Sequence, residues 1–243
     1  MTTPAIKIHE IEPGQQNYID RLLDLFALIF PEYTRYMANI EKSIALGRDF
    51  NPNVIPHHWI IEYEGDLVGF TLFNYLINGN FGFGRYIGVD PDFRKSGFGY
   101  EIIQQSLVQI RLDAEICGKP QPIGFCAEVE TPDQAATAEE SRVRNIRLGD
   151  FLNRVGAIEL NVDYMEPPGI RDKMVTGELV DKPTPMHFIL FPDRPDINPD
   201  LEETAMMVER VLLDHYLLSP NSELLDAVLR TVGSATQMYQ LGD

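Results

Sequence analysis

A strand, a proline-containing turn and a glycine-rich helix start follow one another within residues 85–100, RYIGVDPDFRKSGFGY. Tyr86 and its neighbours favour an extended strand that stops at Pro91. Apolar residues then recur at helical spacing, at Ile103, Leu107, Ile110 and Ala114. The glycines of the motif Arg94-x-x-Gly97-x-Gly99 therefore fall where a strand becomes a helix.

A helix start of this kind favours a bound anion. Its first backbone N–H groups lack partners and lie at the positive end of the helix dipole. Gly97 and Gly99 have no Cβ to keep an anion from the backbone. The alternative is a tight turn that uses glycine only for its positive φ. The dinucleotide string G-x-G-x-x-G and the nucleotide ending G-K-[ST] are both absent, so a different phosphate ligand is favoured.

The string IGVDPDFRKSGFG, residues 87–99, resembles the acyl-CoA motif [QR]-x-x-G-x-[GA] of the GNAT acyltransferase superfamily. The resemblance implies acetyl-CoA as the cosubstrate. Backbone amides of the helix start are implied to bind its pyrophosphate, two basic residues to neutralise it, and the strand backbone to meet the pantetheine amides. The implied pyrophosphate-binding amides are those of Ser96, Gly97, Phe98, Gly99 and Tyr100. The two basic residues are Arg94 and Lys95, and the strand residues that meet the pantetheine are Ile87 and Val89.

A second local match lies in residues 145–157, NIRLGDFLNRVGA, which looks like the family pattern N-x-x-A-x-x-L-Y-x-x-x-G-F. On this match Asn145 is implied to contact the pantetheine arm. The sequence departs from the pattern at Leu152, where the family often has the tyrosine that protonates the leaving thiolate. A basic cluster on the same segment either faces the ribose phosphate or forms a solvated helix face. Its members are Arg142, Arg144 and Arg147.

Hydrophobic periodicity predicts an α/β (α+β) fold. We expect strands near residues 5–11, 59–63, 67–76, 81–89, 123–129, 159–164 and 186–191, and helices near 19–30, 34–45 and 139–155 and after the glycine loop. This order is similar to the GNAT fold: a mixed, mostly antiparallel sheet with a splayed parallel pair, flanked by helices. The expected domains are an acyltransferase domain over residues 1–194 and a helical extension over 195–243, packed on that domain or at an oligomer interface.

Composition narrows the partners. Among 243 residues, 20 Lys and Arg stand against 37 Asp and Glu, for a net charge of −17, which argues against nucleic acid. The charge either steers a cationic acceptor or keeps the protein soluble. Two cysteines build neither a disulfide framework nor a zinc site, and the start lacks a signal peptide. We expect a cytoplasmic protein with no metal and no membrane partner.

Acyl transfer from a thioester to an amine needs proximity, a route for the amine proton and stabilisation of developing charge. Glu128 is the best candidate base, because it lies in the strand beside the cofactor strand, with Glu130 on the same face. A solvent-facing pair at a strand end is the alternative, and His57-His58 is a second candidate base. Tyr164 is the nearest substitute for the missing acid.

The sequence therefore predicts an acyl-CoA-dependent N-acyltransferase, most simply an acetyltransferase. It would transfer an acyl group to the primary amine of a small molecule by direct attack in a ternary complex. The alternative is a non-catalytic CoA-binding regulatory or interaction module with the same fold, since fold alone does not establish turnover. A homodimer is left open.

Overall fold

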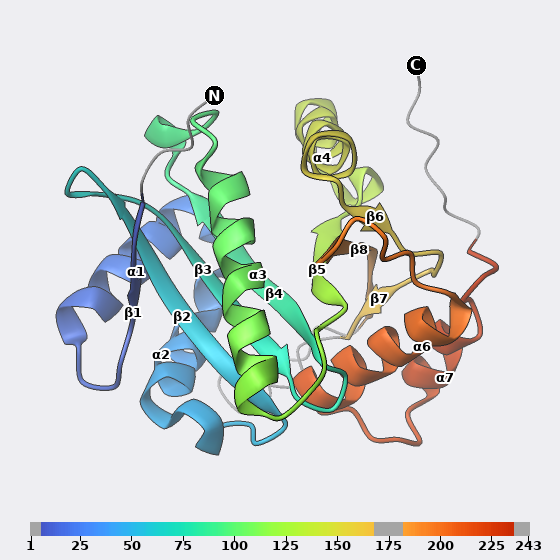
Figure 1. The fold of residues 1–243 in the computed structure, drawn as a ribbon. Helices are drawn as coiled ribbons and strands as arrows, with labels where there is room; N and C mark the ends of the chain where they lie inside the picture. The colour runs from blue at the N-terminus through green and yellow to red at the C-terminus, as the bar shows by residue number, and fades with distance from the viewer. Residues whose placement is uncertain (1–5, 168–181, 236–243) are drawn as a thin grey trace.

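The structure is a computed structural model that describes residues 6–167 and 182–235 (Figure 1). Its centre is a sheet in the order β1-β2-β3-β4-β5-β8-β6, with β7 paired to β8. The ladder between β4 and β5 is parallel and the others are antiparallel. This mixed sheet flanked by helices confirms the predicted fold class. The strands are β1 Lys7–Glu10, β2 Val54–Tyr63, β3 Asp66–Leu76, β4 Phe81–Val89, β5 Gly124–Glu130, β6 Ile158–Glu159, β7 Met165–Glu166 and β8 Thr184–Pro192.

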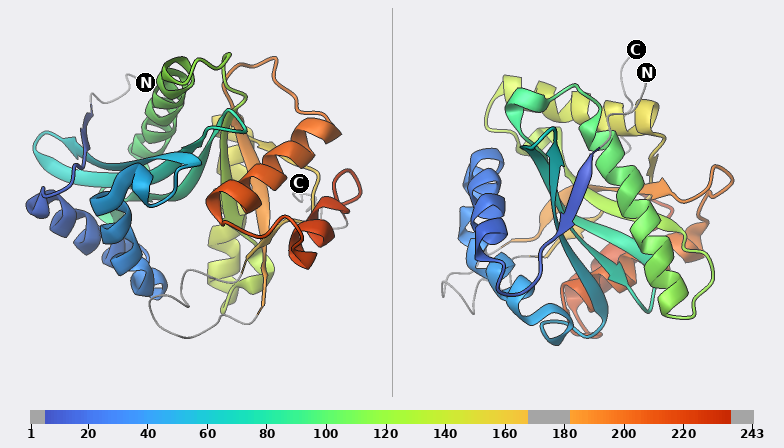
Figure 2. Two further views of the ribbon diagram at one scale, coloured as in Figure 1. Left: turned by 90° about the horizontal axis from the view of Figure 1, so that it is seen from below. Right: turned by 60° about the vertical axis from the view of Figure 1, so that its left-hand side comes forward.

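Helices cover both faces of the sheet. In Figure 2, α1 and α2 lie on one side of the first four strands and α3 on the other. Residues of β5 alternate between two cores: Phe125 packs with α3 and α4, whereas Cys126 packs with α6 and α7. The helices are α1 Gln16–Ile29, α2 Met37–Leu46, α3 Phe98–Ile116, α4 Ala138–Asp150, α6 Leu201–Arg210 and α7 Glu223–Leu229.

The parallel pair is short and then opens. Pairing between β4 and β5 extends only from Gly82 with Phe125 to Gly84 with Ala127, although both strands continue beyond it. Arg85 comes next on β4 and is the extra residue of a β-bulge, because Gly84 and Tyr86 face consecutive residues of β3. The predicted parallel pair is confirmed, and its open end leaves a gap inside the sheet.

Glycines set the ends of the two helices beside this gap. Gly97, at φ 87°, precedes α3, and Gly118, at φ 65°, follows it. The predicted helix over 139–155 is found as α4 followed by a π-helical turn, Phe151–Val155. Gly156 ends it at φ 81°, as the sequence predicted.

The strand expected over residues 159–164 is wrong. Only β6 and β7 are extended, and between them the N–H groups of Val162 and Tyr164 bond to carbonyls two residues back. This segment instead binds the C-terminal extension, through the Asn161 carbonyl to Gly233 and the Asp163 amide to the Thr231 hydroxyl. The bonds to the extension replace the ladder that periodicity alone suggested.

The C-terminal extension packs on the sheet. A capping box between Asp200 and Glu203 starts α6, and Val208 and Leu212 are fully buried against β4, β5 and β8. A π-helical turn, Val211–His215, follows α6 and leads to Tyr216.

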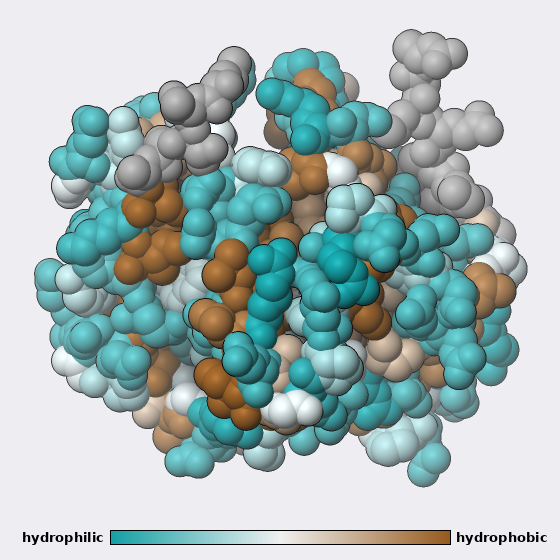
Figure 3. Space-filling model, in the orientation of Figure 1, coloured by the Kyte–Doolittle hydropathy of each residue, from teal (hydrophilic) through white to brown (hydrophobic). Residues whose placement is uncertain are grey.

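The surface is largely hydrophilic. Figure 3 shows teal over most of one face, with a row of brown side chains over α3, where Val108, Leu112 and Ile116 are exposed. Within residues 6–167 and 182–235, no helix is long and apolar enough to cross a membrane.

Candidate active site

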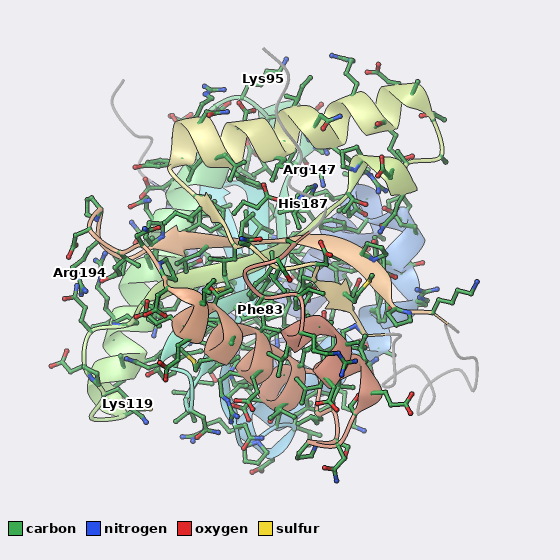
Figure 4. The ribbon with its side chains drawn as sticks, turned by 90° about the vertical axis from the view of Figure 1, so that its right-hand side faces the viewer. Phe83, Lys95, Lys119, Arg147, His187 and Arg194 are labelled. Carbon is green, nitrogen blue, oxygen red and sulfur yellow. The ribbon has the colours of Figure 1, made fainter. Side chains whose placement is uncertain are left out.

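A cavity of about 220 Å³ lies where β4 and β5 separate. Its walls come from the α1–α2 region, from β4, β5, β7 and β8, from α4 with its π-turn, and from the end of the π-helical turn that follows α6. Arg147, labelled in Figure 4 between α4 and the sheet, belongs to the wall, as does Phe83 of β4. The cavity therefore passes through the gap in the sheet and connects its two sides.

Glu128 of β5 faces this cavity. The Tyr216 hydroxyl donates to its Oε2 at 2.7 Å, while its Oε1 is buried and has no hydrogen-bond partner among the described residues. Burial and the nearby charge of Glu166 raise the pKa of Glu128 to about 8, and the hydroxyls of Tyr164 and Tyr216 offset part of that rise. Such a carboxyl can take up a proton at a pH where most carboxylates cannot.

Glu130 lines the same cavity, on the same side of β5. It accepts a hydrogen bond from the Tyr33 hydroxyl at 3.0 Å and one from Arg147 at 3.4 Å, and Arg144 lies 3.6 Å away. The Glu128–Glu130 pair thus faces the cavity rather than the outer surface of the sheet. The two carboxylates differ in their surroundings, because arginines surround only Glu130.

Tyr164 lies beside Glu128 but behind the wall. It is not among the described residues that line the cavity, and its ring stacks on Phe188 with centroids 4.7 Å apart. Its buried hydroxyl lies close enough to Glu128 to lower the pKa of that carboxyl, although the pair does not reach hydrogen-bond geometry. Burial and the Glu128 charge raise the pKa of Tyr164 well above its usual value, so the hydroxyl stays protonated.

The glycine loop and α4 lie at the same end of the molecule (Figures 1 and 4). Arg94 and Lys95 are exposed, and no side chain caps the first turn of α3. A Cβ on Gly97 would meet no atom within 4 Å, so this glycine serves the positive φ and leaves the space before the helix open. An open, uncapped helix start beside basic side chains fits a phosphate group.

The strand segment between the bulge and the loop also fits an extended ligand. Ile87 and Val89 pair with β3 on one side. On the other side the ladder to β5 has already ended at Gly84, so the strand edge faces the gap. Backbone groups at such an edge can bind amides in the manner of an added strand.

The second motif is placed on and after α4. Asn145 is exposed on that helix. Leu152 is packed against the core shared by α3 and β8, whereas Phe151 lines the cavity and contacts the Phe191 ring. No hydroxyl is found at either position. Most of the basic cluster is neutralised nearby, because Arg142 binds Glu139 and Arg144 binds Glu140.

The histidine pair lies away from the cavity wall. His57 is held between Glu10 and Asp113, at 2.9 Å from each. His58 is buried beside Ser43, with 3.0 Å between Nε2 and Oγ. Neither is among the described residues lining the cavity.

Sequence reasoning missed three cavity residues: Arg85, Glu166 and Tyr216. Tyr216 is 88 residues from Glu128, so no local spacing connects the two. The available signal was weak: an aromatic residue at the end of an amphipathic helix that had no assigned role.

A splayed parallel pair beside a glycine-opened helix, with a cavity in the gap, defines the fold class of the acyl-CoA-dependent transferases. The model of the acetyltransferase (GNAT) family matches residues 19–137. The chain thus contains a domain of the GNAT acetyltransferase family, as the motif predicted. Acetyl-CoA is the acyl donor of this family. No curated protein sequence matches the chain.

Solved structures share the fold. A GNAT-family acetyltransferase structure from Bacteroides thetaiotaomicron is 17% identical, with a TM-score of 0.53 over 88% of this chain and 99% of that one. An aminoglycoside 6'-N-acetyltransferase complexed with coenzyme A is also 17% identical, at 0.50 over 80% and 99%. A tandem GNAT protein of clavulanic acid biosynthesis is 14% identical, at 0.51 over 67% of this chain. This chain spans only 46% of that protein's length.

Proposed function

We propose that this protein is an acetyl-CoA-dependent N-acyltransferase that acylates the primary amine of a small molecule by direct attack in a ternary complex. The observation that carries the proposal is Glu128, a carboxyl with a raised pKa that faces a cavity in the gap between β4 and β5. The glycine-opened start of α3 lies beyond the end of the same β4 strand. The residues of the glycine loop are not among the described residues that line the cavity, so the proposed anion site lies beyond its wall, at the far end of β4.

The residues proposed to hold the cosubstrate lie at the uncapped start of α3, at the unpaired edge of β4 and on α4. Backbone amides of residues 96–100 would bind the pyrophosphate, with Arg94 and Lys95 supplying positive charge. The free edge of β4 at Ile87 and Val89 would meet the pantetheine amides, and Asn145 of α4 would contact the same arm. When bound, acetyl-CoA supplies an activated acyl group, whose carbonyl carbon gains the amine nitrogen as its C–S bond breaks.

The protein's own part in the reaction is proton handling. The Glu128 carboxylate takes a proton from the acceptor nitrogen, and its raised pKa lets it return that proton to the leaving sulfur. The Tyr216 hydroxyl holds Oε2 of Glu128 and so fixes the position of the carboxyl. Glu130, which lies beside Arg147 in the cavity wall, helps to attract a cationic amine. Tyr164 acts through Glu128, whose charge it faces from behind the wall.

The C-terminal extension belongs to this site. We propose a boundary between an acyltransferase domain, residues 1–194, and an extension, residues 195–243. Tyr216 reaches Glu128 from the extension, and His215 lines the same cavity. On this proposal the extension shapes the acceptor pocket.

A CoA-binding module without turnover is the alternative function. The observation in its favour is that Phe151 and Leu152 offer no hydroxyl where the family pattern has tyrosine. Such a module would bind CoA at the same loop and release no thiol.

Thermal shift followed by thiol release separates the two functions. We expect acetyl-CoA and CoA to raise the melting temperature, and acetyl-CoA to release thiol in the presence of an accepted amine. Stabilisation with no thiol release across an amine panel would favour the binding module. No stabilisation by either ligand would contradict both functions.

A matched pair of glycine variants tests the loop. Gly97 and Gly118 flank α3 at positive φ, and neither Cβ would touch another atom within 4 Å. Gly97→Ala and Gly118→Ala should therefore lose similar stability, roughly 1 kcal/mol each. Only Gly97→Ala should weaken the shift caused by CoA. Equal CoA shifts in both variants would count against the loop as the phosphate site.

A further inference from the structure

Arg85 lines both this cavity and a small neighbouring pocket beside Ser43, and it has no carboxylate partner in the described part of the chain. Among the described residues, the charged side chains that line the cavity are Arg85, Glu128, Glu130, Arg147 and Glu166. The other arginine, Arg147, lies 3.4 Å from Glu130. Within residues 6–167 and 182–235, no carboxylate oxygen lies within 4 Å of Arg85, and its single hydrogen bond is a long one, 3.4 Å to the Ser43 hydroxyl.

Such a charge is costly to keep inside a protein. A guanidinium carries five N–H donors, and a buried one is normally paired with a carboxylate. Burial lowers the pKa of Arg85, and only the neighbouring tyrosines Tyr86 and Tyr216 oppose that effect. An arginine nevertheless remains charged at neutral pH. A bound anion would remove this cost.

A β-bulge places Arg85 in the cavity wall. It is the extra residue of the β4 bulge, directly after the last pair of the parallel ladder. Bulges beside active sites re-aim side chains, and here the side chain reaches toward Ser43 of α2. Without the extra residue, each side chain of β4 after this point would lie on the opposite face of the sheet.

Tyr216 is a neighbour of both Arg85 and Glu128. Tyr216 bonds to Glu128 and also interacts electrostatically with Arg85. The groups that shift the pKa of Glu128 are Glu166 and two tyrosines, and Arg85 is not one of them. The cavity thus has a cation on β4 and a candidate base on β5, with aromatic rings along the walls at Phe30, Tyr33, Tyr36, Tyr86 and Phe151.

We propose that the amine acceptor carries a carboxylate that binds Arg85, so that the substrate class is amino acids or other carboxylate-bearing primary amines with an apolar body. The inference rests on the proposed function and names its acceptor. In this arrangement the ammonium lies near Glu128 and the carboxylate is held by the arginine fork. The carboxylate could instead belong to the acyl chain of a dicarboxylic acyl-CoA, which the experiment distinguishes.

Three acceptors of one shape test the proposal: L-phenylalanine, L-phenylalaninamide and 2-phenylethylamine. With acetyl-CoA, we expect kcat/KM for phenylalanine to exceed that for the amide roughly 10- to 100-fold, the effect of one charge-assisted hydrogen-bonded pair. Arg85→Gln should collapse this ratio toward one, and Arg85→Lys should restore part of it. Arg194→Gln, at the exposed edge labelled in Figure 4, should leave the ratio unchanged.

A binding measurement keeps the test independent of turnover. Titration of N-acetyl-L-phenylalanine should give heat with the unmodified protein and at least tenfold weaker binding with Arg85→Gln. Circular dichroism checks that the variant is folded, and Arg85→Lys replaces it if it is not. A purely structural Arg85 would lower stability and leave both the ratio and the binding unchanged.

The outcomes separate this inference from the proposed function. Equal or faster turnover of the amide and of 2-phenylethylamine, with Arg85→Gln unchanged in the ratio, overturns the carboxylate acceptor while N-acylation stands. A loss confined to succinyl-CoA as donor would assign Arg85 to the acyl chain and overturn the inference as well. Absence of turnover with every amine, despite CoA binding, overturns the proposed function itself.

Discussion

Two of this protein's clusters of partly or fully buried charge, the His57 network and the cavity, differ in whether their hydrogen-bonding groups have partners. His57 donates to Glu10 through Nδ1 and to Asp113 through Nε2, and Gln109 and Trp59 bond to the same two carboxylates. In the cavity, by contrast, Glu128 Oε1 has no partner among the described residues, and Arg85 has no carboxylate.

The difference separates a structural network from a functional one. Burial disfavours the charged His57, yet its bonds to Asp113 and Glu10 outweigh that effect and raise its pKa to about 9. The network joins β1, β2 and α3 and stabilises the fold when the imidazole is protonated. In the cavity, Glu128 and Arg85 keep unfilled hydrogen-bonding capacity and destabilise the free protein. This is expected where a substrate supplies the missing partners.

The largest expected effect is on the rate of acyl transfer. Glu128→Gln removes the proton acceptor, so kcat/KM should fall about 10²- to 10³-fold, the range for one acid–base group. The shift in melting temperature caused by CoA should stay within error, because the phosphate site is elsewhere. Glu139→Gln, on the exposed face of α4, is the matched control and should retain full activity. An unchanged rate in Glu128→Gln would dismiss Glu128 as the base.

The second effect is on stability, and it comes from removing the histidine at the centre of the His57 network. His57→Gln should lower the free energy of unfolding by about 3 kcal/mol at pH 6, because it leaves the buried Asp113 and the half-buried Glu10 short of a partner. The pKa of His57 is raised above its ordinary 6.5, so its contribution is full below pH 6.5 and is lost as the pH rises to about 9. Urea unfolding at pH 6 and pH 9.5 measures this change. A deficit of the same size at both pH values would contradict a protonated His57.

Local patterns in the sequence predicted what depends on near neighbours. The glycine loop, the hairpin at Glu64-Gly65 and the placement of Glu128 and Glu130 on one strand face all follow from spacing of two to four residues. Arg85 could not be read in this way, because a bulge arises from pairing with β3 and not from composition. Tyr216 was missed because it meets Glu128 only after the extension packs on the sheet.

The third effect is again on stability, but it has the opposite sign: here the variant is expected to be more stable than the unmodified protein. The pKa of Glu128 is raised from 4.5 to about 8. The folded protein therefore loses stability as the pH rises from about 4.5 to 8, because this carboxyl ionises more readily in the unfolded chain. Glu128→Gln avoids that loss. The variant should therefore be more stable than the unmodified protein at pH 8 by roughly 1–3 kcal/mol, and by little at pH 4.5. Urea unfolding at both pH values tests it, and a less stable variant at pH 8 would show that the charge is already compensated.

The smallest effect concerns the bond between Tyr216 and Glu128. The rate needs ionised Glu128, so kcat/KM should rise with pH and level off above about 8. The Tyr216 hydroxyl donates to Oε2 and stabilises the ionised form, so Tyr216→Phe should move this limb to higher pH by roughly 0.5 to 1 unit. At pH 7 the rate would fall about threefold to tenfold, and above the shifted limb it would recover. The pH profile thus separates a tuned base from a distorted pocket: an equal loss at every pH would mean that Tyr216 shapes the cavity without setting the pKa of Glu128.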